Sequence, residues 1–157
     1  MKKLLIVMLI LSSVYACSDN ADQSTDAKES GAASQTVGEN PSYDPDRGSG
    51  KFTNVEVSPT LDKQKAEAGI KVYDVKCASC HKLTDERLVG PGWKGVTQRH
   101  KPEWILNFIT NVDEMLDKDP KAQAQLEICL VRMPNQNLTD DDALAVYEFM
   151  RKNDGVR

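Results

Sequence analysis

Two cysteines and a histidine stand close together near the middle of the chain, in the run Cys77-Ala78-Ser79-Cys80-His81. At the end of a helix, residues three positions apart share a face, so both sulfur atoms can reach the two vinyl groups of one porphyrin and form thioethers. The imidazole of His81 can then bind the iron. This pattern is typical of a c-type haem attachment site and predicts one covalent haem c.

Two other kinds of site use paired cysteines. A zinc site needs a second Cys or His pair at ligand spacing, and after His81 the chain offers only His100 and Cys129, which do not form one. A thioredoxin-like dithiol needs a strand–helix–strand setting, whereas the pattern around Cys77 is helical. The sequence therefore favours haem attachment over both alternatives.

A haem iron bound by His81 has a sixth coordination position, and its occupant decides between electron transfer and small-molecule chemistry. Met133 is the favoured ligand because it precedes Pro134 in an irregular segment after a predicted helix. A lone methionine ordinarily fills the apolar core, but the haem motif favours ligation here. Met115 and His100 are the alternative ligands.

The periodicity of apolar residues is helical, and we find no strand pattern, which predicts an all-α domain. Asp119 and Thr139 have the side chains expected at the N-caps of helices. Proline at a first helical turn marks two of the starts. The predicted helices are 61–79, a second from Pro102 to at least Val112, a third from Pro120, and a last over about 140–152.

The third predicted helix carries an inward stripe made of Ala122, Leu126, Cys129 and Leu130. Its thiol is the cysteine left over after haem attachment. Pairing between molecules is possible in an oxidising compartment, but the position on an inward stripe favours a buried, inert Cys129.

Regular periodicity disappears between His81 and Lys101. The run 88–96 is rich in glycine and apolar residues, which suits a loop over a flat hydrophobic ligand. Trp93 lies in this run. We expect it to pack against the porphyrin, although ordinary core packing would use the same surface.

The N-terminal third of the chain has the composition of an export signal followed by a tether. Lys2 and Lys3 precede an apolar run over 4–16 that is too short to span a bilayer as a permanent helix. Residues 18–58 contain almost no large apolar side chains, so their folding would not offset the entropy of ordering them. The predicted division is a signal peptide over 1–16, a flexible tether over 17–58 and a folded domain over 59–157.

The charge of the chain excludes a nucleic-acid-binding surface. The 157 residues have a formal net charge of −4 and a sequence pI of about 5.2, and the acidity belongs mainly to residues 18–60. There is no basic stripe. Basic side chains near the haem motif either steer an acidic partner or form an ordinary solvated surface. They are Lys76, Lys82, Arg87, Lys94, Arg99 and Arg132.

Several further positions carry a resemblance to a known family. Gly69 and Tyr73 precede the haem cysteines, and Leu144 and Tyr147 lie on the last predicted helix. Over about residues 65–152 the chain resembles the small class I cytochromes c, in which such residues pack the first helix against the last. The resemblance implies the cytochrome c fold, with about four helices around one covalently attached haem.

The same resemblance extends to the residues expected around the iron. Gly90-Pro91 resembles a turn of that family whose proline carbonyl accepts a hydrogen bond from the proximal imidazole. It implies that Pro91 orients His81 and raises its basicity. Met133-Pro134 matches the segment that supplies the distal ligand in that family.

The end of the apolar N-terminal run, Val14-Tyr15-Ala16-Cys17, resembles the lipobox of bacterial lipoproteins. In that class Cys17 becomes the lipidated first residue of the mature protein. Ordinary signal cleavage after Ala16 is the alternative. The resemblance implies a cell-envelope protein, lipid-anchored to a bacterial membrane with its haem domain in the periplasm.

The cytochrome resemblance implies a one-electron carrier rather than an enzyme. We expect it to serve a respiratory chain between a quinol-oxidising complex and a terminal reductase or oxidase. The runs 90–97, 102–104 and 133–137 look like lipoprotein cytochromes associated with nitrous-oxide reductase in some bacteria. The alternative is a haem-based sensor or peroxidase-like enzyme with an open or labile sixth iron position, but only His100 offers acid–base help there.

Overall fold

The computed structural model describes residues 43–157, in which the chain forms six helices and no strand. The predicted all-α class is confirmed. None of the helices in this part of the chain is long and apolar enough to cross a membrane. The predicted signal peptide, Cys17 and the first part of the tether lie outside the described residues. The helices are α1 (Lys63–Lys76), α2 (Val96–Arg99), α3 (Pro102–Thr110), α4 (Val112–Lys118), α5 (Pro120–Cys129) and α6 (Asp140–Asn153).

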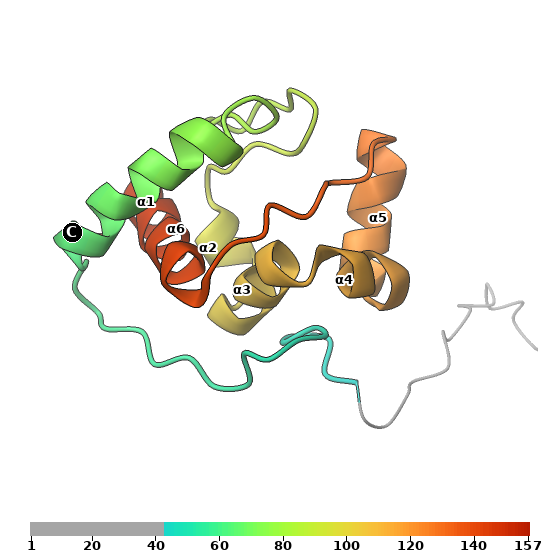
Figure 1. The fold of residues 1–157 in the computed structure, drawn as a ribbon, viewed down its shortest axis with the longest axis horizontal. Coiled ribbons are helices and arrows are strands. Elements are labelled where there is room, and N and C mark those ends of the chain that lie inside the picture. The colour runs from blue at the N-terminus through green and yellow to red at the C-terminus, as the bar shows by residue number, and fades with distance from the viewer. Residues whose placement is uncertain (1–42) are drawn as a thin grey trace, which may run out of the picture. The chain divides into compact units, whose positions relative to one another are not determined.

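Helices α1 and α6 pack against each other across the long intervening chain (Figure 1). Gly69 of α1 permits this close approach, because a Cβ atom there would lie 2.6 Å from the carbonyl carbon of Ala145 and 2.8 Å from Cβ of Phe149. The ring of Tyr73 lies 5.3 Å from that of Phe149. The atoms nearest to Gly69 and the ring paired with Tyr73 thus belong to Ala145 and Phe149, while the expected partners Leu144 and Tyr147 belong to or pack against the same core.

Helix α1 ends earlier than predicted because the haem motif forms a tight turn of its own. Asp62 caps its start by accepting a hydrogen bond from the backbone N–H of Lys65 at 3.0 Å. After Lys76, the backbone N–H groups of Cys80 and His81 both donate to the carbonyl of Cys77, at 3.0 and 2.9 Å. The haem motif therefore follows the end of α1 rather than forming its last turn.

The fold has more helices than the expected four because the middle of the chain breaks into shorter pieces. The predicted helix from Pro102 through Val112 is divided at Asn111, whose φ of −138° and ψ of 49° are not helical. The predicted loop before Lys101 contains the short α2. The carboxylate of Asp154 caps α2 by accepting from the backbone N–H of Thr97 at 2.9 Å.

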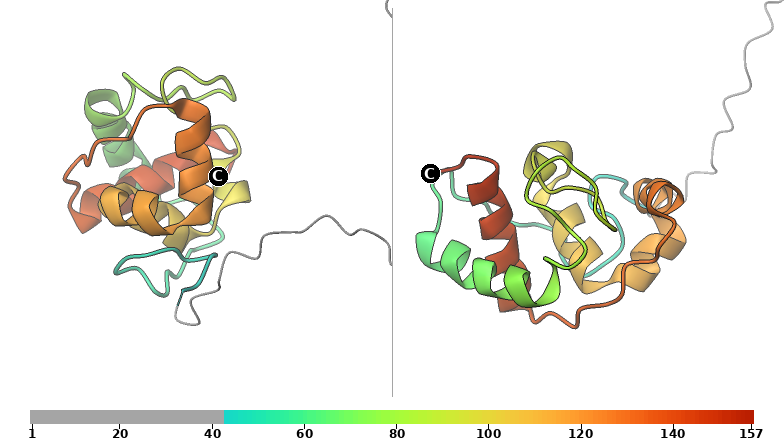
Figure 2. Two further views of the ribbon diagram at one scale, coloured as in Figure 1. Left: turned by 90° about the vertical axis from the view of Figure 1, so that its right-hand side faces the viewer. Right: turned by 90° about the horizontal axis from the view of Figure 1, so that it is seen from above.

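Helix α5 begins as predicted, with the side chain of Asp119 accepting a hydrogen bond from the backbone N–H of Ala122 at 2.7 Å. Its end differs. Leu130 has a φ of 58° and is 84% exposed, so the prediction that it faces inward is wrong. Leu130 follows the last turn of α5 in the left-handed conformation, which turns its side chain away from the inward face of the helix. The segment 131–139 then leads from α5 to α6 (Figure 2).

Residues 43–58, which we call the N-terminal strap, are held along α3 and α4 (Figure 2). The side chain of Asn107, fully buried, accepts from the N–H of Phe52 at 2.9 Å and donates to the carbonyls of Arg47 and Phe52 at 3.0 and 2.9 Å. The prediction of a flexible tether as far as residue 58 is therefore wrong for this segment. Polar side chains of the folded domain hold its backbone, so it needs few large apolar residues.

Replacement of Asn107 by alanine should release the strap. Three hydrogen bonds between the Asn107 side chain and the backbone of the strap would be lost, at about 1 kcal/mol each. We expect a lower free energy of unfolding in urea and faster proteolysis within residues 43–58. Asn111→Ala is the matched control, because its amide donates to the strap only at Ser49, at 3.3 Å. Equal protease sensitivity of the two variants would contradict this account of the strap.

Candidate haem-binding site

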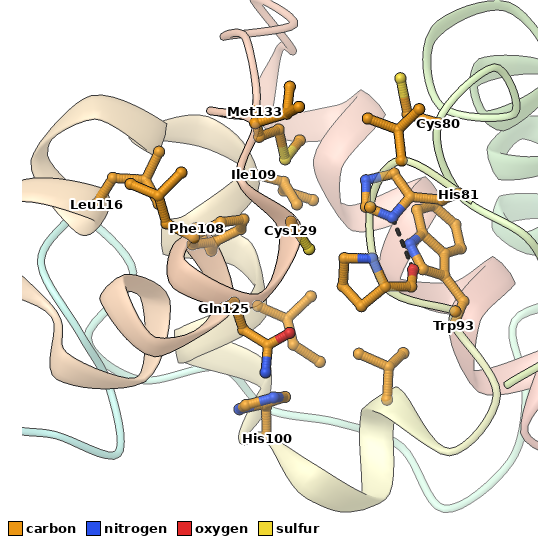
Figure 3. A pocket seen from close by; sticks show the side chains of 18 of the residues that line it. Cys80, His81, Trp93, His100, Phe108, Ile109, Leu116, Gln125, Cys129 and Met133 are labelled. Carbon is orange, nitrogen blue, oxygen red and sulfur yellow. Dashed lines mark hydrogen bonds between the residues drawn. The ribbon is translucent and has the colours of Figure 1, made fainter. Parts of the chain in front are cut away.

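A large pocket lies between the haem motif and helices α3 to α5 (Figure 3). Its empty volume, open mouth included, is about 1060 Å³. Most of its wall is apolar, as a flat hydrophobic ligand requires. The apolar side chains include Val89, Trp93, Ile105, Phe108, Ile109, Leu116 and Leu126.

The two cysteines of the motif lie at one edge of this pocket. Cys80 lines it, and Cys77 is buried beside it with 6% of its surface exposed. Burial raises the pKa of the Cys77 thiol to about 11. A dithiol redox centre needs a thiol of lowered pKa, so this environment counts against thiol chemistry and suits a sulfur that ends as an uncharged thioether.

His81 presents its imidazole to the pocket in one defined orientation. Its Nδ1 donates to the carbonyl of Pro91 at 2.9 Å, which is the hydrogen bond that the family resemblance implies. Burial lowers the pKa of His81, and the Pro91 carbonyl partly offsets this effect. The ring is thus neutral near pH 7 with Nε2 as its available lone pair, which is the form that binds a metal.

Glycine and an aromatic ring complete the surroundings of this imidazole. A Cβ atom at Gly90 would lie 2.7 Å from Nδ1 of His81, so a side chain there would displace the ring. Trp93, with 6% of its surface exposed, lies 5.6 Å from His81 and 4.9 Å from Tyr73 between ring centroids. Trp93 belongs to the core and also lines the pocket, and its packing against a porphyrin stays a prediction.

The structure separates the three candidates for the sixth ligand. Met133 lines the pocket on the side facing His81 (Figure 3). Met115 lies in α4 rather than in a loop, is fully buried, and its sulfur accepts the N–H of Ser49 at 3.1 Å outside the pocket. His100 lines the pocket far from Cys80. The arrangement favours Met133, and its ligation of iron stays a prediction.

A comparison with known protein families agrees with this geometry. The cytochrome c family model matches residues 66–154, which is more than half of the chain. The chain belongs to the cytochrome c family. Members of this family bind a covalent c-type haem, typically one per domain, and carry out haem-based electron transfer. Among curated proteins, none matches the chain.

Solved structures of cytochromes c have the same fold. A cytochrome c from Rhodothermus marinus is 28% identical, with a TM-score of 0.64, covering 67% of this chain and 90% of that one. An engineered form of the Rhodothermus protein bound to a carbene intermediate is 27% identical, with a TM-score of 0.61 and the same coverage. The predicted cytochrome c fold is therefore confirmed.

The residues of this cytochrome fit such a haem. Cys77 and Cys80 offer sulfur at one edge of the pocket, and His81 and Met133 offer a nitrogen and a sulfur donor from the two sides. The walls between them are apolar, which suits a porphyrin. These residues would hold the group.

Sequence reasoning missed several residues that line the pocket of this cytochrome. Cys129 is half-buried and faces the pocket with Met133, so it is not simply a core thiol (Figure 3). Arg99 and Gln125 also line the pocket. Their side chains are polar and follow no motif, so only the placement of α2 and α5 around the pocket could identify them.

Proposed function

We propose that this cytochrome is a one-electron carrier of a cell-envelope respiratory chain in which His81 and Met133 are the two axial ligands of the iron. A haem held in this pocket supplies an Fe(III)/Fe(II) couple. The observation that carries the proposal is the placement of Met133 across the pocket from His81, within apolar walls. Closure of both axial positions suits electron transfer and leaves no site for a substrate.

The residues of the chain have separate tasks in this proposal. Pro91 holds His81 in the tautomer whose Nε2 faces the pocket. Met133 contributes a thioether, a soft ligand that favours ferrous iron and thus a high reduction potential. Trp93, Ile109 and the other apolar side chains exclude water, which limits the reorganisation that accompanies a change of charge.

The mouth of the pocket supports contact with a redox partner through an apolar face. Val89 and Val131 line the pocket and are 38% and 54% exposed. Leu88, next to Val89, and Ile128, three residues before Val131, are 50% and 56% exposed. Arg87 links the two segments by donating to the carbonyl of Ile128. Clustered exposed apolar side chains are typical of interaction surfaces.

Electrostatic steering has less support, because two of the six basic side chains near the haem motif already have acidic partners. Lys82 pairs with Glu86 at 2.8 Å. Arg132 pairs with Asp113 and Asp117 at 3.3 and 3.0 Å. Such pairs leave little net charge to attract an acidic partner.

The proposal includes a location and a partner. Cys17, as a lipidated residue, would anchor the protein to a bacterial membrane with the haem domain in the periplasm. A quinol-oxidising complex would supply electrons, and a nitrous-oxide reductase system is the proposed recipient because the runs 90–97 and 133–137 look like those of cytochromes associated with it.

Carbon monoxide tests the proposed function against the sensor or peroxidase-like alternative. The holoprotein is extracted with detergent from its native membranes, reduced, and mixed with carbon monoxide while its absorption spectrum is followed. A carrier with both axial positions filled should form no carbon monoxide complex on mixing and should transfer one electron reversibly to an electrode. Prompt carbon monoxide binding would overturn the proposal in favour of an open sixth position.

A further inference from the structure

His100 has a buried ring nitrogen that nothing in the described fold uses. Its Nδ1 is buried and has no hydrogen-bond partner among residues 43–157. The ring is fixed by stacking on Trp104, with 4.1 Å between centroids and 14° between planes. An unpaired buried polar atom costs free energy unless a ligand satisfies it. Because His100 lines the pocket, a ligand bound in the pocket could be its partner.

The position of His100 in the pocket indicates which ligand group it would meet. His100 and Gln125 lie at the end of the pocket away from Cys80 (Figure 3), and Arg99 also lines the pocket. In haem c the thioether-bearing carbons and the two propionates stand on opposite edges of the ring. With Cys77 and Cys80 holding one edge, the carboxylates would lie toward His100.

The charges around His100 come from α2 and from α5 with its cap. Burial contributes most to lowering its pKa, and Arg99 of α2 and Lys121 of α5 lower it further. Asp119, which caps α5, raises it. The carboxylate of Asp119 is already engaged, because it accepts from Nε1 of Trp104 at 3.0 Å and from the hydroxyl of Tyr43. A propionate beside the ring would therefore be the new charge that favours protonation.

We propose that His100 binds a haem propionate through its buried nitrogen and takes up a proton from solvent when the iron gains an electron. This rests on the proposed electron-carrier function. The electron comes from the one-electron donor, the proton adds to the imidazole, and no other bond forms or breaks. His100 is thus a positioning residue that couples proton uptake to reduction.

The sign of the expected pH dependence follows from the change of charge at the haem. Reduction lowers the charge at the haem by one unit, so the protonated imidazole is more stable beside the ferrous form than beside the ferric form. The pKa of His100 is then higher in the reduced protein. The reduction potential should fall as pH rises between the two pKa values, and should be flat below and above them.

Spectroelectrochemical titration of the full-length holoprotein from about pH 5 to about pH 9, where perturbed histidines titrate, tests this coupling. A threefold to tenfold difference in the proton affinity of His100 between the redox states would shift the potential by about 30 to 59 mV. His100→Phe retains an aromatic ring to stack on Trp104 and should abolish the dependence. Gln125→Leu, the matched control at the same end of the pocket, should keep it. An unchanged pH dependence in His100→Phe would overturn the inference.

A second measurement needs no substitution at His100. The chain has two histidines, and His81 would be the iron ligand, so a histidine-selective NMR label reports His100 separately. Its pKa should be higher in the ferrous protein, and equal values in both redox states would overturn the inference. A reversible one-electron couple that is independent of pH would overturn this inference alone. Absence of any reversible couple would instead overturn the proposed function.

Discussion

Replacement of Met133 by alanine is expected to lower the reduction potential and to open the iron to external ligands. The substitution removes the thioether that faces His81 across the pocket. Because a thioether favours ferrous iron, we expect a fall of at least about 120 mV, a hundredfold change in a one-electron equilibrium. Redox titration measures the potential, and carbon monoxide should bind the reduced variant on mixing.

Met115→Ala provides the matched control for this prediction. Met115 is also a fully buried methionine, but its sulfur contacts the strap at Ser49 and lies outside the pocket. This variant should lose stability, by about 2–5 kcal/mol as for other buried methionines truncated to alanine. Its potential and its exclusion of carbon monoxide should be retained. The reverse result, with Met115→Ala opening the iron and Met133→Ala unchanged, would reassign the ligand.

Replacement of Gly69 by alanine should be among the most damaging changes outside the pocket. The added Cβ atom would lie 2.6 Å from the backbone carbonyl carbon of Ala145, so α1 and α6 would have to separate. Overpacking usually costs about 1–3 kcal/mol, and a clash with backbone should reach the top of that range. Since small domains are stable by only about 5–15 kcal/mol, chemical denaturation should show a large fall in midpoint.

The control for Gly69→Ala is Lys71→Ala on the exposed side of the same helix. An exposed substitution of this kind should change the free energy of unfolding by less than about 0.5 kcal/mol. If both variants unfold at the same denaturant concentration, the tight contact between α1 and α6 does not contribute to stability, and this account of the helix pair is wrong.

The features predictable from sequence are those set by local pattern. Cys77, Cys80 and His81 form a contiguous motif, and all three lie at or beside the pocket. The prediction that Pro91 faces His81 came from the family resemblance rather than from the residues themselves, and the hydrogen bond is present. The start of α5 at Pro120 followed from its capping residue. The chemical roles of these residues stay predictions until haem spectra are measured.

The features that escaped prediction depend on contacts between distant segments. The strap has the composition of a free tether, but the side chain of Asn107 supplies its backbone with hydrogen bonds. Asn107 lies in the predicted second helix, and no local pattern indicates that its amide will be buried or what it will bind. The left-handed turn at Leu130 likewise has no glycine to mark it.

The most direct test of the central claim, that His81 and Met133 close both axial positions of a haem in this pocket, is the absorption spectrum of the oxidised, detergent-extracted protein. The account predicts the weak long-wavelength charge-transfer band of a thioether sulfur bound to ferric iron, present in the unsubstituted protein and in Met115→Ala and absent from Met133→Ala. A ferric haem spectrum without that band in the unsubstituted protein would contradict it.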